Sequence, residues 1–126
     1  MKKIIQTTEA PLPIGCYSQA IQVGNMIHIS GQIALDPASG ELVGNNIQQQ
    51  VKQVFENIDA VARASGGDIN QVVALTVYLM KLSDIDAVNA AITDYFKEPW
   101  PARTTIQVSA LPRQALVEIT AMMIID

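Results

Sequence analysis

The last quarter of the chain, residues 99–126, constrains the fold more than any other stretch. It holds one acid, Glu118, inside an apolar segment that runs from Ala115 to Ile125. A carboxylate buried alone costs on the order of several kcal/mol, so a fold keeps one only where it is paired, hydrogen-bonded or used in chemistry. Arg103 precedes this segment, at the mouth of a β-rich run. It is either an ion-pair partner of Glu118 or a clamp for an anionic ligand on which Glu118 acts.

Composition limits the possible classes of function. A chain of 126 residues fits one domain, residues 1–126. It is 49% apolar and only 16% charged, which suggests that some apolar surface enters subunit contacts. The net charge is −4 and the eight lysines and arginines are spread singly, which makes a nucleic-acid partner unlikely.

Single cysteine and histidine residues exclude two further kinds of site. Cys16 has no partner for a disulfide, and with His28 it cannot form any of the usual zinc ligand sets, so we expect no metal. The apolar run after Lys2 and Lys3 is too short for a signal peptide, and no run approaches the ~20 residues of a membrane span. We therefore expect a cytoplasmic protein without a membrane partner.

Hydrophobic periodicity predicts two helices. Apolar residues recur at helical spacing over 47–65, after the candidate N-cap Asn46 and before Gly66 and Gly67. A second apolar stripe runs from Ile85 to Phe96, and Ser83 is its candidate N-cap.

The remaining segments predict strands at 3–7, 17–23, 26–30, 72–80, 103–109 and 115–125, with a hairpin turn at Gly24 and Asn25. This order predicts an α+β fold with a single mixed β-sheet and two helices on one face. Strands 72–80 and 115–125 are apolar on both sides, so the second face also needs a cover. A second copy of the chain is the simplest cover, and we predict an oligomer.

Several side chains have both a structural and a functional interpretation. Arg103 is either part of a surface-facing strand or a bidentate clamp for a carboxylate or phosphate. Glu118 is either half of an ion pair or a general acid/base. Tyr17 either packs in the structure or lines a pocket, and Asn89 is either a solvated amide or part of a pocket. Structural or solvated roles fit better for His28, Cys16, Arg63 and Arg113.

Five motifs together resemble one family. They are Ile14-Gly15-Cys16-Tyr17-Ser18-Gln19, Ile29-Ser30-Gly31-Gln32, Val88-Asn89, Pro101-Ala102-Arg103, and Leu111-Pro112 followed by Val117-Glu118-Ile119. In order and spacing they resemble the reactive-intermediate deaminase family (Rid, also called YjgF or L-PSP), from about residue 3 to 125. The resemblance implies a chorismate-mutase-like fold and a homotrimer with sites between subunits. It also implies hydrolysis of 2-imino acids such as 2-iminobutanoate and 2-iminopropanoate to 2-keto acids and ammonia, with no cofactor.

The resemblance also implies a role for each site residue. Arg103 would bind the substrate carboxylate and Glu118 would activate the attacking water. Tyr17, Ser30 and Asn89 would line the pocket, and the backbone around Gly31 and Thr105 would face the ligand.

Three positions depart from the family pattern. Thr105 stands where many members have cysteine, Thr120 where they have glutamate, and Cys16 where they often have proline. Thr105 puts the substrate range in doubt. Two alternatives stay open: a non-catalytic regulatory trimer that binds a small 2-keto or amino acid, and an endoribonuclease or translation inhibitor, against which the charge and the lone His28 argue.

Overall fold

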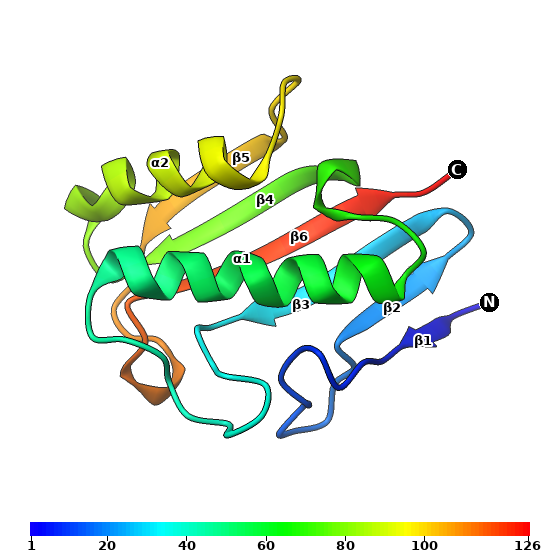
Figure 1. Cartoon of the computed structure of the whole chain (residues 1–126), viewed down its shortest axis with the longest axis horizontal. Helices are drawn as coiled ribbons and strands as arrows, with labels where there is room; N and C mark the ends of the chain where they lie inside the picture. The colour runs from blue at the N-terminus through cyan, green and yellow to red at the C-terminus, as the bar shows by residue number, and fades with distance from the viewer.

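The computed structural model describes all 126 residues and contains one six-stranded sheet and two long helices (Figure 1). The strands are Lys3–Ile5 (β1), Ala20–Val23 (β2), Met26–Gln32 (β3), Val72–Leu79 (β4), Ala102–Gln107 (β5) and Val117–Ile124 (β6), and the helices are Ile47–Ala64 (α1) and Ile85–Tyr95 (α2). The strand order is β1-β2-β3-β6-β4-β5, with β4 and β5 parallel and every other pair antiparallel. The predicted α+β fold with one mixed sheet is confirmed.

The two chain crossovers place both helices on one face of this sheet. β3 and β4 each run antiparallel to β6, so they are parallel to each other, and α1 connects them across β6. α2 then connects β4 to the parallel strand β5, further in the same direction. Crossovers between parallel strands are almost always right-handed, so two crossovers that advance in the same direction put their helices on the same side. Figure 1 shows α1 and α2 together in front of the sheet.

The predicted N-cap is confirmed for α1 but not for α2. Asn46 caps α1, because its side chain accepts a hydrogen bond of 2.9 Å from the backbone N–H of Gln49. The prediction of Ser83 as the cap of α2 was wrong. Ser83 lies inside the short 3-10 turn Leu82–Asp84, which takes up the first turn, and Asp84 becomes the cap residue.

The predicted strand over 17–23 is also shorter than expected, because β2 begins at Ala20. The backbone N–H of Tyr17 donates to the carbonyl of Gly15 at 2.9 Å, so the chain turns there instead of extending. Gln19 keeps one backbone bond to the sheet, from the N–H of Ser30, while its side chain serves the preceding loop.

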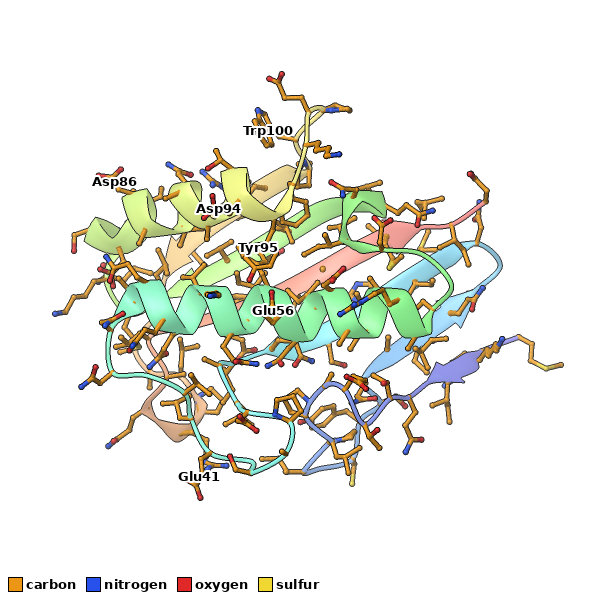
Figure 2. All side chains as sticks on the ribbon, in the orientation of Figure 1. Glu41, Glu56, Asp86, Asp94, Tyr95 and Trp100 are labelled. Atoms are coloured by element: carbon orange, nitrogen blue, oxygen red, sulfur yellow. The ribbon has the colours of Figure 1, made fainter.

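The hydrophobic core lies between the helices and the facing side of the sheet. In β6, Val117, Ile119, Ala121 and Met123 are buried, while the alternate residues are only half-buried. Phe55 of α1 packs against Phe96 just after α2, with ring centroids 5.4 Å apart. Tyr95 of α2 lies next to Glu56 of α1 (Figure 2), and its hydroxyl donates a hydrogen bond to the Glu56 carboxylate. The pKa of Tyr95 is raised mainly by burial and further by the Glu56 carboxylate.

The other face of the sheet has no helix over it. By strand register it carries large apolar side chains that remain exposed by two-fifths or more, namely Ile4, Val23, Met26 and Ile106. The predicted apolar character of this face is therefore present, and it is open within one chain. No helix of the structure is long and apolar enough to cross a membrane.

Three buried amide side chains fasten the loops at one end of the sheet. Gln19 accepts from the N–H of Thr7 and donates to the carbonyls of Thr7, Ala10 and Pro11, at 2.7–3.2 Å. Asn57 of α1 donates to the carbonyl of Leu35 at 3.0 Å, and Gln50 accepts from the N–H of Leu116 at 2.9 Å. These contacts are long-range in sequence, and they give backbone groups of irregular segments the hydrogen-bond partners that secondary structure gives the strands.

We predict that Gln19→Leu lowers the free energy of unfolding by about 2–4 kcal/mol, because it leaves several backbone groups of the 7–11 loop without partners. Urea denaturation measures this change. Gln22→Leu is the matched control, since Gln22 makes one exposed hydrogen bond within its own hairpin. Equal stability of the two variants would show that the Gln19 network does not hold the loop.

Candidate active site

The residues singled out from the sequence separate into two pockets. The first, with a volume of about 510 Å³, contains Tyr17, Ser30, Gly31 and Glu118. The second, of about 470 Å³, contains Asn89 and Arg103. The other lining residues of the first pocket are Pro11, Leu12, Ile14, Gln19, His28, Ile29, Gln32, Ile33, Leu35, Pro112, Arg113 and Thr120, and we call it the Glu118 pocket.

Strand register explains why Arg103 and Glu118 do not meet within one chain. Arg103 pairs with Leu75 across β4 and β5, so it lies on the face that the helices cover. Glu118 pairs with Tyr78 across β4 and β6, on the open face. Partners directly opposite in a sheet share a face. The interpretation of Glu118 as half of an ion pair with Arg103 is therefore wrong within the chain, and the only ion pair present joins Arg63 to Asp59.

Glu118 is a half-buried carboxyl group without an ion-pair or hydrogen-bond partner in the chain. Burial raises the pKa of Glu118 above its ordinary value, because removal from water disfavours the charged form. Gly31 of β3 makes room for it. A Cβ atom at Gly31 would overlap the Glu118 Oε2 atom and lie 3.0 Å from Cδ. A side chain at position 31 would therefore force the Glu118 carboxylate to shift.

Two of the pocket's hydroxyl groups, those of Tyr17 and Ser30, lie at the loop before β2. The Ser30 hydroxyl donates to the carbonyl of Ser18 at 2.6 Å, which leaves its oxygen free to accept. Tyr17 is half-exposed, and its hydroxyl lies 3.5 Å from the N–H of Ile14, too far for a strong bond. The Tyr17 hydroxyl is therefore available to a ligand.

Arg103 is oriented by a neighbour on α2. Its Nη1 donates to the side-chain oxygen of Asn89, which leaves most of the five guanidinium donors free. Thr105, two residues on, shares the face of Arg103 and has a buried hydroxyl without a hydrogen-bond partner. Trp100, on the loop between α2 and β5 (Figure 2), completes one wall of this pocket.

Sequence reasoning missed one charged residue of the Glu118 pocket. Arg113 follows Pro112 in a short turn before β6; it is exposed, as we expected, but it also lines this pocket. Its Nη2 donates to the carbonyl of Gly40 at 3.2 Å, a contact across 73 residues of sequence. Leu111-Pro112 belongs to one of the five motifs, but no local pattern in the sequence indicated the loop against which this turn folds.

Comparison with known proteins identifies the family. The profile described as Endoribonuclease L-PSP matches residues 7–125 of this chain. The chain belongs to this family. A RutC family protein of Pyrococcus abyssi is 48% identical over 120 residues, which are 95% of this chain and 94% of the relative. A 2-iminobutanoate/2-iminopropanoate deaminase of Mus musculus is 46% identical over 121 residues, which are 96% of this chain and 90% of the relative.

Solved L-PSP family structures share the fold. The crystal structure of RidA from an Antarctic Psychrobacter superposes with a TM-score of 0.95 at 45% identity, over 98% of this chain and 99% of that one. The resemblance to the Rid, YjgF or L-PSP family drawn from the five motifs is thus confirmed. The predicted homotrimer stays a prediction, because one chain is described.

We predict that Glu118→Gln stabilises this L-PSP family protein at neutral pH. The raised pKa means that the folded state holds its proton more tightly than the unfolded state, so stability falls as pH rises through the folded pKa. Removing the charge should therefore add up to about 1 kcal/mol at pH 7.5, because solvent still reaches and screens this group. Thermal unfolding should show this gain vanish near pH 4, where the carboxyl is largely protonated in both states. A gain that is equal at both pH values would contradict the assignment.

Proposed function

We propose that this chain is a hydrolytic deaminase that converts 2-imino acids, such as 2-iminobutanoate and 2-iminopropanoate, to 2-keto acids and ammonia. The observation that carries the proposal is Glu118, an unpaired, half-buried carboxyl group in a pocket that also contains Tyr17, Ser30 and Gly31. The named deaminases among its relatives support the same reaction class.

The chemistry needs one group that can accept and return a proton. Ionised Glu118 takes a proton from a water molecule while the water oxygen attacks C2 of the protonated imine. The C–N π electrons move to nitrogen, which gives a neutral tetrahedral carbinolamine. Burial raises the pKa of Glu118, which favours return of the proton after it has been accepted. A positioned acid/base group contributes roughly 10²–10⁴ to a rate.

The second half of the reaction reverses the proton's direction. Protonated Glu118 returns its proton to the amine nitrogen, and the C–N bond breaks with its electrons leaving on nitrogen. The Glu118 carboxylate, now ionised again, accepts the hydroxyl proton as the C2=O bond forms and then releases it to solvent, and the products are ammonia and the 2-keto acid. The Tyr17 hydroxyl and the Ser30 oxygen are placed to hold the water or the new oxygen, since neither is saturated by protein contacts.

A complete site needs a carboxylate anchor, and we infer that Arg103 of a neighbouring copy provides it. A guanidinium binds a carboxylate through two parallel hydrogen bonds, and this would aim C2 at the water. Asn89 then acts as a positioning residue, because its side-chain oxygen already accepts from Arg103. The open apolar face supports contact between copies, and a homotrimer is the assembly that we propose.

The decisive assay measures imine turnover. Threonine dehydratase generates 2-iminobutanoate from threonine, and semicarbazide traps the free imine. We expect the wild-type protein to divert imine from the trap, and Arg103→Ala and Glu118→Ala each to lose at least about 10²-fold in kcat/KM. Arg63→Ala is the matched control, since Arg63 lies on α1 and pairs only with Asp59.

The same assay separates the alternatives. Saturable binding of 2-ketobutanoate without imine turnover, unaffected by Glu118→Ala, would replace the deaminase with a binding-only trimer. Full activity of Arg103→Ala would remove the proposed anchor and leave the hydrolytic role of Glu118 intact.

A further inference from the structure

The Glu118 pocket contains a cationic side chain, Arg113, that the proposed reaction does not use. Arg113 is the only arginine or lysine among the lining residues. It forms no ion pair with Glu118 or any other acid, although the chain carries a net charge of −4. Its one hydrogen bond, to the Gly40 carbonyl, leaves the remaining guanidinium donors free.

The turn that carries Arg113 has an unusual backbone conformation. Arg113 has φ 58° and ψ 21°, and Gln114 has φ 59°, so two consecutive residues with side chains adopt the left-handed conformation. Residues with side chains rarely adopt this conformation, and such strain tends to occur at functional sites. The hydrogen bond to the Gly40 carbonyl holds the Arg113 side chain against the 36–44 loop.

Part of the lining of the Glu118 pocket is apolar. Leu12, Ile14, Ile33 and Leu35 line the pocket, and the loops that carry them are fastened by Gln19 and Asn57. The pocket has a volume of about 510 Å³. Pockets of ~300–1,000 Å³ enclose ligands much larger than a four-carbon acid. A substrate whose C2 lies at Glu118 therefore has room for a longer side chain, with Arg113 as the cation available to its far end.

We propose that Arg113 binds a second carboxylate, so that the preferred ligands are dicarboxylic 2-imino or 2-keto acids. This inference rests on the proposed function for the orientation of the substrate. The α-carboxylate lies on Arg103 of the neighbouring copy, C2 lies at Glu118, and the side-chain carboxylate reaches Arg113. The reaction itself is unchanged: water adds and ammonia leaves at C2.

The test compares mono- and dicarboxylic ligands. L-Amino-acid oxidases, with catalase present, generate the imines of glutamate and 2-aminobutyrate, and calorimetry measures binding of 2-oxoglutarate and 2-oxobutanoate. We expect Arg113→Met to raise the KM for the glutamate-derived imine and the Kd for 2-oxoglutarate about 5- to 10-fold, and to leave both values for the monocarboxylic pair unchanged. Arg113→Lys should restore part of the loss, and Arg63→Met is the surface control.

Each other outcome overturns a different claim. If both imines are turned over but Arg113→Met alters them equally, Arg113 acts only through its contact with Gly40, and the inference fails while the deaminase stands. If no imine is turned over, the proposed function fails, and the two keto acids still decide the inference. Equal binding of 2-oxoglutarate to wild type and Arg113→Met would then overturn it.

Discussion

The structure depends on a sheet that is covered on only one side. The two crossovers, over α1 and over α2, advance in the same direction between parallel strands and so leave both helices on one face. The hydrophobic core lies on that face only, and the opposite face has exposed apolar side chains. Burial of such a face against another copy would contribute roughly 25 cal/mol for each Å² removed from water. Strand register then puts Arg103 on the covered face and Glu118 on the open face of one chain.

The isolation of Glu118 follows from this arrangement. On the covered face a lone carboxylate would be fully desolvated, and in open solvent it would keep an ordinary pKa. Half-buried on the open face, beside Gly31, it has a raised pKa and no partner. The surrounding loops are irregular, yet Gln19, Gln50 and Asn57 fasten them through buried amide groups. The pocket is therefore formed before a ligand arrives, which reduces the entropic cost of binding.

Sequence patterns predicted what depends on local periodicity. The helical stripe over 47–65, the Asn46 cap and the apolar strands 72–80 and 115–125 all correspond to observed elements. Element ends were less accurate, because Ser83 and the residues before Ala20 are set by turns that local propensity does not specify.

The site was predicted as a set of residues more accurately than as a geometry. Tyr17, Ser30, Gly31 and Glu118 do share one pocket. The separation of Arg103 from them depends on the parallel register of β5 against β4, which sequence alternation alone cannot reveal. Arg113 was missed for a similar reason, since its contact with Gly40 spans 73 residues.

The most direct test of a site divided between copies is complementation between two inactive variants. Arg103→Ala and Glu118→Ala chains are unfolded, mixed in equal amounts and refolded, with each variant refolded alone as the control. In a closed ring that takes arginine from one copy and glutamate from its neighbour, about a quarter of the sites in random mixtures contain both residues. The account predicts recovery of about a quarter of the wild-type imine turnover. A mixture as inactive as its components would contradict it, because both residues would then have to act within a single chain.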